Sequence, residues 1–282
     1  MTAATVRRPL AVSVVLIALL AACTPPGPPD RALPPRIGEP TFLSVSNQAL
    51  APIAVGSANG VWTTTDVART WHAARPAVRG AQSIGYTAGR AYISRGQHYE
   101  IREPSLRTEI VTRRWPFPGT VTSLASDPRH NRMWALARIG DDGQTLRYTK
   151  DGGRVWWVVS GTGLCLHPRA LAASSEPGRD GRVRLFAACR EGLFASDDLG
   201  YSFRRLTSAP ANVGDVATSA FDAGTVVIAS PVVRISRDRG ETFAAKGLSA
   251  RLVAVDPRNP SLIFAVAQNG RLYASADGGN TF

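Results

Sequence analysis

Residues that bind metals or act as activated nucleophiles are scarce in this sequence. The 282 residues include four histidines and three cysteines, and the histidines do not form a metal-binding box. A phosphate-cradling glycine loop is also lacking, because no helical pattern follows Gly161-Thr162-Gly163. No Gly-x-Ser-x-Gly nucleophile elbow occurs either. The sequence therefore indicates no metal ion and no other cofactor.

Lysine is rare as well, since only Lys150 and Lys246 among the 33 basic residues are lysines. The formal net charge is nevertheless +12, which attracts anionic lipids and polyanionic envelope glycans. Arginine pairs such as Arg113-Arg114 and Arg204-Arg205 are more typical of solvated strand faces than of phosphate readers. Because the sequence contains no nucleic-acid-binding module, we expect an unknown protein or an anionic glycan as the partner, and no nucleic acid.

Hydrophobic runs long enough to span a bilayer comfortably are absent near the N-terminus. The apolar run 10–22 has 13 residues and follows Arg7-Arg8, as in an export signal. It ends in Leu-Ala-Ala-Cys, which resembles a bacterial lipobox. That resemblance implies a signal peptide over 1–22, cleavage before Cys23, lipid attachment to its thiol, and a membrane anchor on the extracytoplasmic face. The alternative is an ordinary secretory signal. The proline-rich segment 23–40 is predicted to be an extended tether.

The two remaining cysteines are predicted to form a disulfide, because an exported chain meets an oxidising compartment. Cys165 precedes one expected strand (169–174) and Cys189 ends the next (183–188). Pairing of these strands would bring both thiols to the same end of a hairpin. Two buried thiols and a metal pair are the alternatives, although a fourth ligand besides His167 is not evident.

An eight-residue pattern, Ser/Thr-x-Asp-x-Gly-x-Thr-aromatic, occurs five times, with one mismatch in each of the first two copies. The last three intervals between its aspartates are 47, 40 and 39 residues, and the first interval, 85, is about two such periods. A decayed copy over 102–109 fills the gap, which gives six units. The aspartates and the aromatic residues that follow them are Asp66 and Trp71, Asp151 and Trp156, Asp198 and Phe203, Asp238 and Phe243, and Asp277 and Phe282.

Each unit predicts four short antiparallel strands. Apolar stretches such as 225–229 and 263–267 are typical of strands, and Asp-x-Gly between two strands is typical of a hairpin turn. Four-stranded units of about 40 residues repeated around an axis form a β-propeller. We therefore expect an all-β propeller of about six, at most seven, blades over 41–282, acting as a monomer.

The octamer resembles the Asp-box (BNR) repeat of sialidase-type propellers, which also occurs in sortilin-like domains, xyloglucan-active hydrolases and Ycf48-like assembly factors. The resemblance implies that each aspartate caps the amides of its turn and that each aromatic residue packs into its blade. Ca²⁺ binding is the alternative for these aspartates, but one carboxylate per turn is a poor supply for a cation with six to eight oxygen ligands.

The last blade is expected to be incomplete. Phe282 ends the chain at the point where the fourth strand of the last unit should begin. Either the chain is a fragment or an N-terminal segment supplies that strand. Residues 35–40 contain two prolines and make a poor strand, which favours the fragment.

Catalytic residues cannot be carried over from sialidases, which use an arginine triad, a Tyr–Glu pair and an aspartate. Arg36-Ile37-Gly38 lacks the proline of the family's Arg-Ile-Pro motif, and Tyr86, Tyr92 and Tyr99 have no glutamate at a recognisable spacing. A separate glutamate cluster falls in the decayed unit, at positions 100, 103 and 109. The favoured interpretation is a non-catalytic, lipid-anchored envelope protein. The alternative is an exported glycoside hydrolase of sialidase or xyloglucanase type, which would need two flanking carboxylates or the sialidase set.

Overall fold

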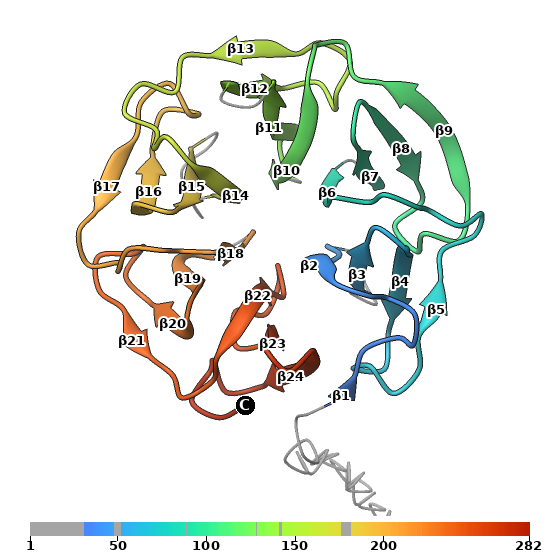
Figure 1. The fold of residues 1–282 in the computed structure, drawn as a ribbon. Helices are drawn as coiled ribbons and strands as arrows, with labels where there is room; N and C mark the ends of the chain where they lie inside the picture. Colours follow the sequence, from blue (N-terminus) through green and yellow to red (C-terminus); the bar gives the residue numbers. More distant parts are fainter. Residues whose placement is uncertain are drawn as a thin grey trace, which may run out of the picture.

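The chain folds into a ring of six four-stranded antiparallel sheets around a central channel (Figure 1). This computed structural model describes residues 31–47, 52–87, 89–127, 129–140, 143–175, 182–220 and 222–282. The described residues contain strands and turns and no helix. The predicted all-β propeller is therefore confirmed, with six blades.

Every blade runs from an inner strand beside the channel to an outer strand at the rim. The first three blades contain β2 (Pro40–Val45), β3 (Ile53–Ser57), β4 (Gly60–Thr64) and β5 (His72–Ala73); β6 (Ser83–Thr87), β7 (Arg90–Arg95), β8 (His98–Arg102) and β9 (Glu109–Arg114); and β10 (Thr120–Asp127), β11 (Arg132–Ile139), β12 (Gly143–Thr149) and β13 (Trp157–Val159). The last three contain β14 (Pro168–Ser175), β15 (Val183–Cys189), β16 (Gly192–Ser196) and β17 (Arg204–Leu206); β18 (Asp215–Ser219), β19 (Asp222–Ser230), β20 (Val232–Ser236) and β21 (Ala244–Ala245); and β22 (Ala250–Val255), β23 (Ile263–Ala267), β24 (Arg271–Ser275) and β1 (Arg31–Ala32).

The sixth blade is complete, so the expectation of a missing strand is wrong. Its outer strand is β1, in which Arg31 lies opposite Leu272 and Ala32 opposite Arg271 (Figure 1). The Trp71 indole of the first blade donates a hydrogen bond to the Ala32 carbonyl oxygen. Phe282 lies outside the strands and packs against the apolar cluster between blades five and six. The donated strand therefore comes from residues just before Pro34 and Pro35, and not from 35–40.

The hydrophobic core is divided into six clusters, one between each pair of neighbouring blades. Trp134 of β11 is fully buried between blades three and four, and its indole nitrogen donates to the Leu199 carbonyl of blade four at 2.8 Å. The aromatic residue of each octamer packs against one of these clusters. Apolar burial between blades, rather than within a single sheet, therefore holds the ring together.

The second blade lacks the octamer and holds its outer turn with a buried ion pair. Arg102 and Glu100 of β8 are 0% and 2% exposed, and the Arg102 Nε atom donates to Glu100 Oε2 at 2.8 Å. Arg95 forms a second ion pair with Glu100. Arg102 also donates to the Leu106 carbonyl, inside the turn that the decayed repeat predicted. The pair of Glu100 and Arg102 therefore contacts the outer turn of this blade, where the other blades have the octamer aspartate.

Candidate functional site

The inner strands surround a narrow channel with a volume of about 170 Å³. Its waist is apolar, with Leu43, Ile84, Leu124, Leu171 and Val253 among the lining residues. Polar side chains line the mouth of the channel at which the inner strands begin. The residues at or next to these strand starts that line the channel are Thr41, Gln82, Thr122, Arg169 and Asp215, which we call the mouth ring.

Asp215 and Arg169 carry the only charges among the described residues that line the channel. The Asp215 carboxylate accepts hydrogen bonds from the Val216 and Val253 amides, both at 2.9 Å, and so bridges blades five and six. Loss of solvation raises the pKa of Asp215 to about 7, against these two hydrogen bonds, which lower it. Arg169 is exposed, and its guanidinium donates to the Asn212 side chain at 2.8 Å.

Sequence reasoning missed the mouth ring, although a signal was present. Ser83 and Ser123 occupy the same kind of position as Asp215, since each hydroxyl accepts from an amide of the next inner strand, that of Leu124 or Leu171, at 2.9 Å. Alignment of the inner strands against one another would have revealed a recurrent polar side chain there. The sequence comparison aligned the octamers instead, and their turns lie at the other end of each blade from the starts of the inner strands.

The five octamer aspartates lie in turns between the third strand of a blade and its outer segment. In each turn the Ser/Thr hydroxyl two residues earlier donates to the carboxylate at 2.6–2.7 Å. A backbone amide four residues later donates to the same oxygen, as Thr70 does to Asp66 at 2.9 Å. Except at Asp151, where Val155 replaces Thr, a hydroxyl also donates to the second oxygen. These donors occupy the carboxylates, which argues for a capping role over Ca²⁺ binding.

Asp238 gives a pH-dependent test of this cap. Hydrogen bonds from the Thr242 hydroxyl and amide and from Ser236 lower the pKa of Asp238 to about 2. Because the folded pKa lies below the unfolded value of about 3.9, the stabilisation is full above pH 4 and disappears as the pH falls towards 2. We expect Asp238→Asn to lower the Tm by roughly 2–4 °C at pH 7, as loss of a cap does, and by less with each step below pH 4. Calorimetry across this pH range measures the difference in Tm between the unchanged protein and Asp238→Asn, and Asp222→Asn, at a carboxylate outside the octamers, is the control. A difference in Tm for Asp238→Asn that stayed constant as the pH fell would contradict this account.

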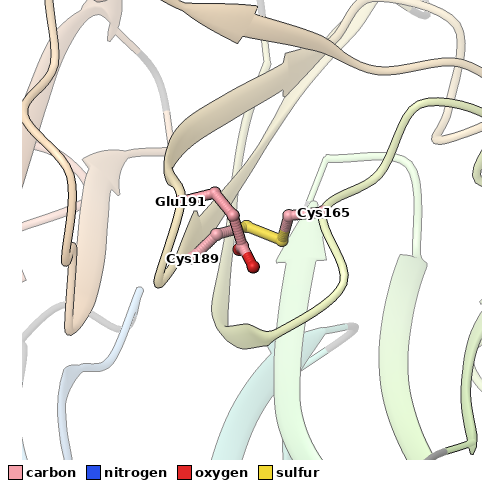
Figure 2. A group of neighbouring side chains, drawn as sticks. All are labelled: Cys165, Cys189 and Glu191. Carbon is pink, nitrogen blue, oxygen red and sulfur yellow. A yellow bond between two sulfur atoms is a disulfide. The ribbon is translucent and has the colours of Figure 1, made fainter.

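The predicted disulfide between Cys165 and Cys189 is confirmed (Figure 2). Pro168 of β14 lies opposite Cys189 of β15, so the hairpin brings the two residues to one end, as expected. The Glu191 carboxylate lies beside the sulfur atoms and forms a 2.7 Å contact with the His167 ring. Oxidised sulfurs do not act as thiolate ligands, so the disulfide argues against a metal site here.

The sialidase-type candidates do not converge on the channel. Arg36 lies in the connection between β1 and β2, outside the channel lining. Tyr86 lines the channel, but burial raises the pKa of its hydroxyl far above the usual range. Tyr92 stacks with Tyr99, and Tyr99 stacks with Trp115, between blades two and three. Glu100 is committed to its arginine partners.

Comparison with known proteins supports the fold. The sequence matches no protein-family model and no curated protein. Among solved structures, the chain is similar to the GH74 xyloglucanase Xcc1752 from Xanthomonas campestris, with a TM-score of 0.61 and 16% identity over 89% of this chain and 46% of the enzyme. A GH74 enzyme from Niastella koreensis matches with a TM-score of 0.54 and 17% identity over 82% of this chain and 34% of that one. YCF48 bound to D1 peptide matches with a TM-score of 0.51 and 12% identity, over 90% and 97% of the two chains.

These likenesses show a β-propeller fold. The chain spans less than half the length of either GH74 enzyme that it matches, whereas its match to YCF48 covers nearly that whole chain. The predicted signal peptide and Cys23 lie outside the described residues. Within the part of the chain that the structure describes, no helix is long and apolar enough to cross a membrane.

Proposed function

We propose that this protein is a non-catalytic, lipid-anchored propeller on the extracytoplasmic face of a bacterial membrane, and that it binds a protein or glycan partner at the mouth ring. The observation that carries the proposal is the chemistry of the channel. Asp215 is the single carboxylate among the described lining residues, and both its oxygens accept backbone hydrogen bonds. A glycosidase of the common type needs two carboxylates flanking the scissile bond.

The size of the channel favours the same function. Its volume of about 170 Å³ is below the roughly 300–1,000 Å³ typical of small-molecule sites. It admits a protruding side chain or sugar substituent rather than a whole oligosaccharide. Arg169 offers that group an exposed cation, and both oxygens of Asp215, the other charged member of the mouth ring, are occupied by backbone amides, which suits a carboxylate or another anionic group.

An exported location is supported by the disulfide, because such bonds persist in oxidising compartments. The anchor itself rests on the Leu-Ala-Ala-Cys sequence before Thr24. YCF48, whose structure is described as bound to D1 peptide, is a propeller of similar extent and supports a peptide or protein as the partner.

Reversal of the charge at the mouth ring tests this function. In pull-downs from envelope extract at moderate salt, we expect Arg169→Glu to lose the partner that the unchanged protein enriches. Arg258→Glu, an equal charge change at an exposed turn between β22 and β23, should keep it. Cys23→Ser should move the protein out of the membrane fraction without changing the partner.

Two results would contradict the proposal. One is a set of captured proteins and glycans that does not differ between the unchanged protein and Arg169→Glu. The other is turnover of a fluorogenic glycoside that is lost in Asp215→Asn, which would establish the glycoside hydrolase alternative.

A further inference from the structure

The exposed large hydrophobic side chains of the described residues are concentrated on one part of the rim. Four of the seven are Val155, Trp157, Val158 and Tyr201, which we call the rim patch. Val158 is 59% exposed and Tyr201 51%. A fifth, Leu166, lies on the connection that leads from β13 to β14. Gathered exposed apolar residues of this kind are typical of interaction sites, whereas scattered ones are not.

The two parts of the rim patch belong to different blades and are held together by hydrogen bonds. After β13, the chain of blade three passes the turn of blade four that contains Tyr201. The Ser160 hydroxyl and the Thr162 amide both donate to the Tyr201 carbonyl, at 2.9 and 3.0 Å. The Phe203 amide donates back to the Thr162 carbonyl at 2.8 Å. These bonds fix Tyr201 of blade four beside the end of β13, on the Trp157 side, whereas Val158, the next residue of the strand, projects to the opposite face of the sheet.

The edge of the third blade differs from the other short rim strands. β13 is the last strand of its sheet and pairs with β12 alone, so its outer edge presents backbone donors and acceptors. At their exposed positions the other short rim strands carry alanine, arginine or histidine, as in β5 (His72–Ala73), β17 (Arg204–Leu206, with Leu206 buried) and β21 (Ala244–Ala245). β13 instead combines a free edge with exposed Trp157 and Val158.

The charges around the rim patch are positive on balance. Lys150 and Arg154 are exposed just before Val155, and Arg204 and Arg205 are exposed just after Tyr201. Of the nearby acids, Asp151 and Asp198 are octamer aspartates whose carboxylates cap their own turns. Glu241 pairs with Arg204 at 2.8 Å and Asp197 with Arg239 at 3.4 Å, which leaves Lys150, Arg154 and Arg205 as the excess positive charge. A partner segment with acidic residues beside an apolar stretch is therefore complementary to this surface.

We infer that the rim patch is a docking surface for an extended, acid-flanked apolar segment of a partner protein, which adds a strand beside β13. A stacked sugar fits less well, because the Trp157 ring already contacts Tyr148, at 6.2 Å between ring centres, and the Lys150 ammonium, 5.5 Å from the ring centre. A second copy of this chain would bring the same positive charges to the interface, which is unfavourable.

A membrane surface is disfavoured by the position of the patch, an argument that rests on the proposed lipid anchor. β13 lies on the opposite side of the ring from β1 (Figure 1). Seven residues separate Cys23 from Arg31, and the eight steps between them reach at most about 28 Å, which holds the rim of blade six near the membrane. The rim patch then faces away from the lipid and towards other envelope proteins.

Selection from a library of displayed random peptides of about ten residues, with the full chain as bait, tests this inference. We expect enriched peptides with alternating apolar residues between acidic ends. Their affinity should fall at least about tenfold in Val158→Glu, because a charge would enter the apolar contact. Val67→Glu, the same change at an exposed valine outside the patch, should bind as the unchanged chain does, and so should Arg169→Glu at the mouth ring.

A charge swap sharpens the test. Lys150→Glu with Arg154→Glu should change the selected preference from acidic to basic flanks. The inference is overturned if no peptide distinguishes Val158→Glu from Val67→Glu, or if the flank preference does not respond to the swap. It is also overturned if Val158→Glu abolishes binding to vesicles of anionic phospholipid, or dissociates a homodimer, while no peptide binds. Because Arg169→Glu leaves this site intact, failure here is separate from failure of the mouth ring.

Discussion

Replacement of Arg102 by Met should lower the free energy of unfolding by about 3–5 kcal/mol, the usual cost of breaking a buried ion pair from one side. The reason is that Glu100, 2% exposed, would lose the 2.8 Å hydrogen bond from its fully buried partner and keep only Arg95, whose side chain is 34% exposed, as a counter-charge. The Leu106 carbonyl in the outer turn would also lose a donor. Chemical denaturation of the variant beside the unchanged protein measures the loss.

A double-mutant cycle separates the pair from other effects of the substitutions. Glu100→Gln should also be strongly destabilising, whereas Glu100→Gln with Arg102→Met should cost much less than the sum of the two, because no uncompensated charge remains. Arg107→Met, at an exposed arginine of the same turn, should change stability by less than about 0.5 kcal/mol. Strict additivity of the two buried substitutions would disprove the coupling between Glu100 and Arg102.

The second blade also shows where sequence reasoning stops. The octamers predicted five turns correctly because their contacts are local: the residues two before and four after each aspartate donate to it. The sixth turn is held by Glu100 and Arg102, two residues apart on one strand. A glutamate and an arginine two residues apart are not a recognisable sequence motif. They can be identified as a structural pair only once both side chains are known to be buried. Length and period predicted the position of the turn but not what stabilises it.

The closing strand and the channel mouth could not be predicted for a different reason. β1 is two residues long and pairs with β24 across almost the entire chain, so no local pattern marks Arg31 and Ala32 as a strand. Asp215 acquires its environment only when β18 and β22 lie side by side around the channel. Period and turn chemistry therefore predict the blades, whereas the contacts between blades require the closed ring.

Loss of the disulfide is expected to have the other large effect. The cross-link between Cys165 and Cys189 closes a loop over a separation of 24 residues, which in the chain-entropy account stabilises the folded state by about 3.5 kcal/mol. Cys165→Ala with Cys189→Ala should therefore lower the Tm by roughly 7–14 °C. Alanine is the appropriate replacement because Cys189 is fully buried, and a serine hydroxyl there would add a separate cost.

The same bond joins the connection that follows β13 to β15, so its loss also bears on the rim patch. Dithiothreitol added to the unchanged protein should reproduce the Tm of the double variant and should leave that variant unaffected. Tyr201 is held by the connection through Ser160 and Thr162, and loosening it should weaken peptides selected on the patch more than partners bound at Arg169. A reduced protein that keeps both its Tm and its peptide affinity would show that packing alone, with Leu164 against the cluster between blades three and four, fixes this connection.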